Sequence, residues 1–190
     1  MRKLLIAGLF VALSAGAFGQ VSSNGPVNAD YGKKITAADP VEAKIAKDVR
    51  HQLLLLPWYS MFDDLEFTVE GRTVTLNGYV TSIHAVTKSD AEGVVKRIEG
   101  VDKVVNNIKV LPPSSLDDQV RRETYHAIAE TGSLSRYFWP AAPDMRIIVD
   151  NQRVTLVGRV NRESDKNMAN IAANTVPGVF QVTNDLRVVK

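Results

Sequence analysis

The sequence contains no cysteine, and this absence excludes several kinds of chemistry at once. Disulfides, thiol catalysis and cysteine-ligated metals are unavailable to the chain, and so is the cysteine that carries the anchor of a bacterial lipoprotein. Tryptophan is also scarce, with two residues among 190. We therefore expect a protein that is not a lipoprotein, and the position of each tryptophan becomes informative.

Long apolar runs are almost absent as well. The one that stands out, Leu4 to Leu13, is short for a transmembrane helix. It follows the basic residues Arg2 and Lys3 and precedes small residues at the two positions that a signal peptidase reads, Ala17 and Gly19, which is typical of a secretory signal peptide. We expect residues 1–19 to be a signal peptide that is cleaved before Gln20. The mature chain is then a soluble periplasmic protein with no transmembrane segment, and secretion beyond the cell stays open.

An excess of charge of one sign is missing too. Cleavage of the signal peptide removes two of the 23 basic residues and leaves 21, equal to the 21 acidic residues. A neutral chain lacks the basic surface that nucleic acids require. We therefore expect no nucleic acid among the partners.

What the sequence does contain is one pattern of elements, written twice. The first copy opens at Asp39 with Asp-Pro-Val-Glu, a strong helix start, and its second helix stops at Gly100. The second copy repeats the order helix, strand, strand, helix, strand, and its second helix stops at Gly178. We predict an α+β fold of two αββαβ domains, each with two helices on one face of a three-stranded mixed sheet. The predicted segments are a flexible N-terminal segment at 20–38, domain 1 at 39–111, a linker at 112–114 and domain 2 at 115–190.

A glycine interrupts the same strand in both copies. "TVTLNGYV" and "RVTLVGRV" alternate apolar and polar residues as half-buried strands do, but Gly78 and Gly158 lie within them. Glycine weakens a strand, so a structural need has to retain it. We interpret the need as a helix that crosses close above the strand, where a Cβ atom would block it. The alternative is a bulge that curves the strand.

These strands and the segments after them resemble tandem BON domains (bacterial OsmY and nodulation domains). The resemblance rests on "VTLNGYV" with "GVDKVVNNIKV", on "VTLVGRV" with "GVFQVTNDLRV", and on a spaced lysine and alanine in each second helix. Those helix residues are Lys88 and Ala91, then Lys166 and Ala169. The resemblance implies a non-enzymatic periplasmic protein that binds phospholipid or envelope partners. It further implies a role in envelope integrity under osmotic or other envelope stress.

Two aromatic loops lie at the same place in both copies, between the first helix and the hairpin. The first aromatic loop is Leu56–Phe62 and the second is Leu134–Pro143, and together they hold both tryptophans. Tryptophan and tyrosine suit membrane interfaces and protein contacts, and an arginine can meet a phosphate headgroup. The alternative is that the rings close each core or fill the seam between the copies. The candidate lipid- or partner-binding residues are Trp58, Tyr59, Arg136, Tyr137 and Trp139.

Signs of catalysis or metal binding are weak. The three histidines, at 51, 84 and 126, lack ligand spacing, so we expect solvated or capping roles. An acidic cluster of Asp63, Asp64, Glu66 and Glu70 lacks the spacing of a calcium loop and is interpreted as a solvated face. No nucleophile elbow, dinucleotide fingerprint or phosphate loop occurs. We expect no cofactor, no metal and no enzymatic activity, and a hydrolase acting on envelope polymer is the least favoured hypothesis.

Two binding hypotheses remain. In the first, the exported protein associates with an anionic phospholipid surface or an envelope protein through its aromatic loops. In the second, it is a protein scaffold without lipid contact that holds a partner or itself through sheet edges. The residues do not define the oligomeric state. In both hypotheses Gly78, Gly100, Gly158 and Gly178 have structural roles only.

Overall fold

The computed structural model describes residues 25–26, 39–139 and 143–189. The expected signal peptide lies outside the described residues. Of the predicted N-terminal segment, the structure describes only Gly25–Pro26, which forms the short strand β1. This strand pairs antiparallel with β2 (Asp64–Glu70) and lies at the outer edge of the first sheet.

Domain 1 has the predicted order of elements. After β1 and β2, the middle strand β3 pairs antiparallel with β2 and parallel with the last two short strands. The predicted final strand is divided in two, with the break at residues 107–108, where the side chain of Asn106 accepts the N–H of Ile108 at 3.1 Å. The remaining elements are α1 (Pro40–Leu54), β3 (Thr73–Val80), the 3-10 turn η1 (Ser82–His84), α2 (Val86–Lys96), β4 (Lys103–Asn106) and β5 (Lys109–Val110).

Domain 2 repeats the arrangement, with an undivided last strand. Its sheet has the order β6, β7, β8, and β7 is antiparallel to β6 and parallel to β8. The predicted α+β fold is thereby confirmed. The elements are α3 (Ser115–Ala129), the 3-10 turn η2 (Leu134–Tyr137), β6 (Met145–Asp150), β7 (Arg153–Val160), α4 (Glu163–Asn174) and β8 (Gln181–Val188).

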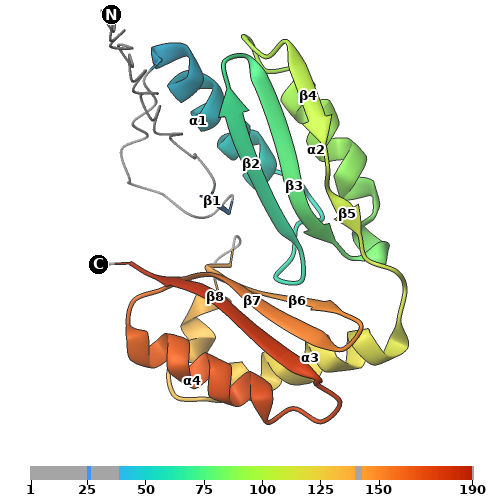
Figure 1. The fold of residues 1–190 in the computed structure, drawn as a ribbon, viewed down its shortest axis with the longest axis vertical. Coiled ribbons are helices and arrows are strands. Elements are labelled where there is room, and N and C mark those ends of the chain that lie inside the picture. The colour runs from blue at the N-terminus through green and yellow to red at the C-terminus, as the bar shows by residue number, and fades with distance from the viewer. Residues whose placement is uncertain (1–24, 27–38, 140–142, 190) are drawn as a thin grey trace, which may run out of the picture.

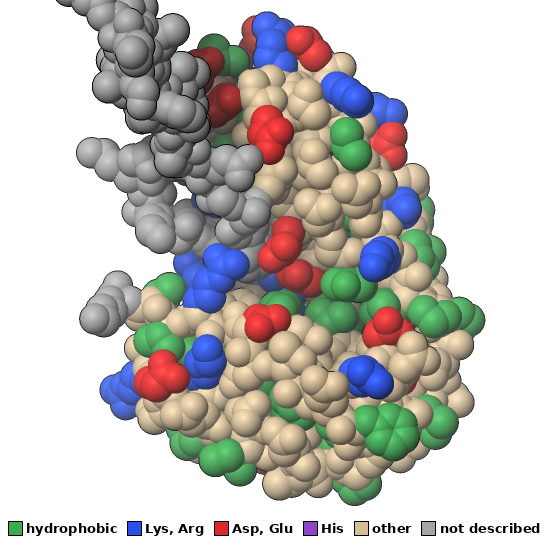
Figure 2. Space-filling model, viewed as in Figure 1, with side chains coloured by type: hydrophobic (Ala, Val, Ile, Leu, Met, Phe, Trp, Pro, Cys, Tyr) green, Lys and Arg blue, Asp and Glu red, His purple; other side chains and the backbone are tan. Residues whose placement is uncertain are grey.

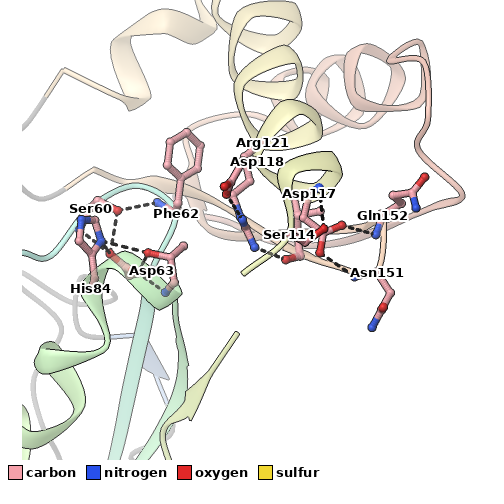
Figure 3. A network of polar contacts seen from close by, with 12 residues as sticks. Ser60, Phe62, Asp63, His84, Ser114, Asp117, Asp118, Arg121, Asn151 and Gln152 are labelled. Carbon is pink, nitrogen blue, oxygen red and sulfur yellow. Dashed lines mark hydrogen bonds and ion pairs between the residues drawn. The ribbon is translucent and has the colours of Figure 1, made fainter. Parts of the chain in front are cut away.

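An acidic residue in the first turn of each domain's first helix holds the hairpin turn. In α1, Asp39 caps Val41, but Glu42 does not complete a capping box, because its carboxylate accepts the N–H of Gly71 in the turn between β2 and β3. In α3 the cap is Ser114, within the predicted linker, and Asp117 accepts the N–H groups of both turn residues between β6 and β7 (Figure 3). The helix and hairpin of each copy are therefore joined at the same point.

The predicted reason for the strand glycines is wrong. A Cβ atom on Gly78 would lie 2.1 Å from the carbonyl oxygen of Asp64, and one on Gly158 would lie 2.0 Å from that of Asp144. The close neighbour is thus the backbone of the adjacent strand and not a helix. The register of β2 with β3 continues through Gly78 without an extra residue, and so does that of β7 with β8 through Gly158, so these pairs have no bulge at either glycine. Their φ angles of +115° and +119° add a second requirement for glycine.

The two domains meet where the first aromatic loop reaches the second sheet. Figure 1 shows α3 and α4 below the sheet of domain 2, whose other face is turned towards domain 1. Two side chains of β6 lie on the face of the sheet away from the helices, and both are buried. They are Arg146 and Ile148. The sheet of domain 2 is therefore covered on one face by its helices and, at β6, on the other by domain 1. Within the described residues, no helix is long and apolar enough to cross a membrane.

Candidate functional site: two aromatic loops and the seam between the domains

The first aromatic loop is held by a buried carboxylate at its end. Asp63 is fully buried and accepts hydrogen bonds from the backbone N–H of Ser60 at 3.0 Å and from the N–H of Thr81 at 2.8 Å. The Ser60 hydroxyl donates to the same carboxylate at 2.7 Å, and Nδ1 of His84 lies 2.7 Å from it (Figure 3). The loop is thereby fixed to the end of β3 and to η1, which follows it.

These contacts correct two predictions. Asp63 and Asp64 are buried, at 0% and 5% exposure, so only Glu66 and Glu70 of the acidic cluster reach solvent. His84 is bound to Asp63 rather than solvated. The described residues contain no group of three or more acidic or histidine side chains that could hold a metal. The cluster is therefore a support for the loop.

The side chains of the first aromatic loop divide between the surface and the seam. Trp58 is 58% exposed. Tyr59 is half-buried with its hydroxyl inside, the Arg146 guanidinium of domain 2 lies 5.0 Å from its ring centre, and burial raises the pKa of the hydroxyl. The carbonyl of Met61 accepts the N–H of Ile147 in β6 at 2.9 Å, and Phe62 packs against the core of domain 2. The loop therefore joins the domains and exposes one tryptophan.

A buried ion pair crosses the seam beside these rings. Arg146, with no exposed surface, donates to the carboxylate of Asp64 at 3.1 Å. Burial raises the pKa of Asp64 to about 6, although the charge of Arg146 acts in the opposite direction. Glu66 raises this pKa further and Arg187 lowers it. The other two guanidinium nitrogens of Arg146 are also buried, and among the described residues they have no hydrogen-bond partner. Asp64 is therefore the side chain that balances the buried charge of Arg146.

The second aromatic loop is fixed differently, by a tyrosine. Tyr137 is 3% exposed, and its hydroxyl donates to Asp165 at 2.6 Å and accepts the N–H of Asn161 at 2.9 Å. Arg136 donates to the same Asp165 carboxylate at 2.6 Å. The hydrogen bond with Tyr137 is the largest cause that raises the pKa of Arg136. Trp139 projects outward and is 78% exposed. Residues 140–142 of this loop lie outside the described residues.

The five predicted binding residues thus fall into two groups. Trp58 and Trp139 lie on the surface, whereas Tyr59 and Tyr137 are packed inside and Arg136 is engaged by Asp165. Three other residues contact the aromatic loops and hold them in place, and the sequence did not predict this role for them. They are Arg146, Asp63 and Asp165. The burial of Arg146 had one signal in the sequence. In "MRIIVD" the apolar Ile148 lies on the same face of the strand as Arg146, and a strand buried on both faces shows that pattern.

The described surface carries no strong field of one sign. Figure 2 shows basic and acidic side chains interspersed over both domains on the face that it presents. Many of these charges are paired, as Lys44 is with Glu99 and Arg72 with Asp102. Charge alone therefore gives this face little attraction for an anionic polymer or surface.

One further contact is identical in the two copies and explains a repeated asparagine. The side-chain amide of Asn106 donates to the carbonyl of Lys88 at 2.9 Å, and that of Asn184 donates to the carbonyl of Lys166 at 2.9 Å. Each asparagine also accepts an N–H from the residue two positions further on. It therefore ties the last strand of each domain to the start of its second helix.

Comparison with known proteins is consistent with this internal repeat. The BON domain family matches the chain twice, at residues 42–112 and 117–190. The chain is 30% identical over 125 residues to the outer membrane lipoprotein DolP of Haemophilus influenzae, a match that covers 63% of this chain and 64% of that relative's length. A solved structure of the C-terminal domain of CdsD, from the type III secretion system of Chlamydia trachomatis, matches 76% of this chain and 96% of its own, with 13% identity and a TM-score of 0.31. With two family matches that together span most of its residues, the chain belongs to the BON domain family.

Proposed function

We propose that this protein is an exported, non-enzymatic binding module that associates with a phospholipid surface or with envelope components of the periplasm. In that place it supports envelope integrity and tolerance of osmotic or other envelope stress. The proposal is supported by its membership of the BON family and by the name of its relative, an outer membrane lipoprotein. The absence of cysteine means that this chain cannot carry a lipid on cysteine, so contact with lipid has to come from its surface.

The observation that carries the proposal is the exposure of both tryptophans on equivalent loops. Trp58 is 58% exposed and Trp139 78% exposed, while the other rings of the loops are used for packing. Covering a large exposed apolar side chain with a partner removes apolar surface from water, which favours association. An indole group with an apolar body and a polar N–H is well suited to the membrane interface.

Co-sedimentation with vesicles tests the proposal. The expected mature chain, Gln20–Lys190, is mixed with vesicles of phosphatidylcholine alone or with added phosphatidylglycerol, at low and high salt. We expect binding to the anionic vesicles that weakens with salt and falls when Trp58 and Trp139 are replaced by alanine. If the wild-type chain binds no vesicle under any of these conditions, the lipid version of the proposal is wrong.

One observation supports the scaffold as a second candidate. Among the described residues strand β8 pairs only with β7, so it is an edge strand of its sheet. Such an edge is a template for a strand of another chain. Light scattering and crosslinking test this candidate, and a monomer with no crosslinked envelope partner would contradict it.

A further inference from the structure

Domain 1 has a groove beside its second helix. The groove has a volume of about 280 Å³ and lies between the end of α1 with the loop after it and the outer face of α2. One wall is Leu55, Leu56 and Pro57, which continue directly into the exposed Trp58. The residues of α2 that line it are Ser89, Asp90, Gly93, Val94 and Arg97.

A glycine in the middle of α2 opens this groove. Glycine costs about 1 kcal/mol relative to alanine inside a helix, so it is retained there for a reason. Packing does not supply the reason, because a Cβ atom on Gly93 would meet only Nη1 of Arg97, at an ordinary contact distance of 3.8 Å. In the second copy, where Lys166 corresponds to Lys88, the position of Gly93 is occupied by Ile171. The missing side chain at Gly93 therefore leaves the floor of this groove open, where domain 2 carries an isoleucine.

The charges of the groove form a cation and an anion on one helix face. The 3.8 Å contact places the Arg97 guanidinium over Gly93, and Asp90 precedes Gly93 by one helical turn. Neither Asp90 nor Arg97 has an ion-pair partner in the described part of the chain. Domain 2 has Met168 and Thr175 at these positions, so it lacks both charges.

The surroundings of the groove are apolar and exposed. Leu55 is 63% exposed, and Val86, 49% exposed, lies on the same α2 stripe as Asp90, Gly93 and Arg97. A pair of opposite charges framed by exposed apolar side chains matches a zwitterionic headgroup at the surface of a lipid layer better than it matches a free anion. Phosphate accepts two N–H groups from a guanidinium, and a carboxylate accepts N–H groups from a primary ammonium.

We propose that this groove binds the headgroup of phosphatidylethanolamine, with Arg97 on the phosphate and Asp90 on the ammonium group. Leu55, Pro57 and Trp58 then contact the glycerol and upper acyl region. Phosphatidylcholine fits less well, because its quaternary ammonium has no N–H to donate. Phosphatidylglycerol fits less well, because its glycerol head is uncharged and gives Asp90 no cation to pair with. The physiological setting of this site rests on the membrane association proposed above, but the headgroup contact itself is testable in solution.

The test uses short-chain lipids below their micelle-forming concentrations and the backbone amide spectrum of the chain from Gln20. We expect dihexanoylphosphatidylethanolamine to shift the amide signals of Leu55 and Gly93, and the choline and glycerol analogues to shift them less. Gly93→Ile and Arg97→Thr, which install the residues of domain 2, should each weaken this binding at least about tenfold. Asp90→Asn should abolish the preference over the choline lipid. Thr175→Arg in domain 2 is the matched control and should leave the affinity unchanged.

The outcomes separate this inference from the proposed function. Gly93→Ile fills open space and raises helix propensity, so loss of fold does not account for its effect. If no ethanolamine-specific shift occurs, or if Gly93→Ile binds as well as the wild type, the groove proposal is wrong even when the protein still sediments with vesicles. If the shifts occur but vesicles are not bound, the groove proposal holds and the membrane function fails.

Discussion

The two domains build the same corner of one fold with different residues. After β3 the N–H of Thr81 donates to the carboxylate of Asp63, whereas after β7 the equivalent N–H of Asn161 donates to the hydroxyl of Tyr137. In both domains the acceptor also holds the aromatic loop. The fold thus requires a buried acceptor at this point, but it does not prescribe which side chain supplies it.

A second difference lies in the aspartate whose carbonyl oxygen lies closest to the strand glycine. Asp64 of domain 1 points into the seam and pairs with the fully buried Arg146, whereas Asp144 of domain 2 pairs with Arg159 near the surface. The same position therefore serves a domain contact in one copy and a local ion pair in the other. Because the two copies provide matched positions, each substitution in one has a natural control in the other.

The largest expected difference comes from these two aspartates. Asp64→Ala leaves the buried guanidinium of Arg146 without an acceptor and should lower the free energy of unfolding by about 3–5 kcal/mol. Asp144→Ala removes a pair whose side chains are 36% and 18% exposed, and it should cost about 1 kcal/mol or less. Urea unfolding of both variants at pH 7 measures the two losses. Equal losses would contradict the special role of the seam.

Substitutions of the two strand glycines, in contrast, should lower the free energy of unfolding by similar amounts. Gly78→Ala and Gly158→Ala each place a Cβ atom against a strand carbonyl at a positive φ, and each should cost about 3 kcal/mol or more. The same urea titrations measure this, with Gly71→Ala as a control at a positive φ with open space around it. A small loss in one copy would show that its strand can move away from its neighbour.

A third prediction concerns acidity and the carboxyl group of Asp64. Its pKa is about 6 in the folded chain against an ordinary 3.8, so the folded state binds the proton more tightly than the unfolded state. The resulting stabilisation is complete below pH 4 and is lost as the pH rises through 6, a change of about 3 kcal/mol at most. Asp64→Asn should remove this part of the pH dependence of unfolding. An identical pH profile for wild type and variant would contradict the assignment.

A smaller loss of stability than at Asp64 or the strand glycines is expected at the support of the second loop. Tyr137→Phe removes the hydroxyl that accepts from Asn161 and donates to Asp165, and should cost about 1–2 kcal/mol. Tyr125→Phe, at a half-buried tyrosine of α3, is the control. Thermal unfolding detects the difference, and a Tyr137→Phe variant as stable as the control would show that water replaces the hydroxyl.

The fold could be predicted from the sequence because its signals are local and occur twice. Alternating apolar residues, the helix start at Asp39 and the repeated glycines define the elements without knowledge of the third dimension. The seam could not be predicted, because Arg146 meets Asp64 across 82 residues of chain and nothing local to either residue indicates the other. The same reason hid the burial of Asp63, whose partners come from both sides of the hairpin.

The aromatic loops were located correctly from the sequence, but the sequence did not separate their exposed rings from their buried ones. Tyr137 and Trp139 are two residues apart, yet one is buried under Asp165 and the other faces solvent. The direction of each ring depends on distant side chains, and periodicity does not apply to an irregular loop. Which rings are free to meet a partner is therefore information that only the three-dimensional structure provides.

The fluorescence of the two tryptophans, one in each domain, tests directly whether their exposed indole groups contact a lipid surface. Trp139→Phe leaves Trp58 as the only tryptophan, and Trp58→Phe leaves Trp139, so fluorescence then reports on one loop at a time. We would titrate each variant with vesicles of phosphatidylcholine, phosphatidylethanolamine and phosphatidylglycerol while sedimentation records binding. If the aromatic loops contact lipid, we expect a blue shift of the emission in both variants, because the exposed indole groups leave water. Emission that does not change while the protein sediments with the vesicles would contradict this contact, because binding would then use another surface.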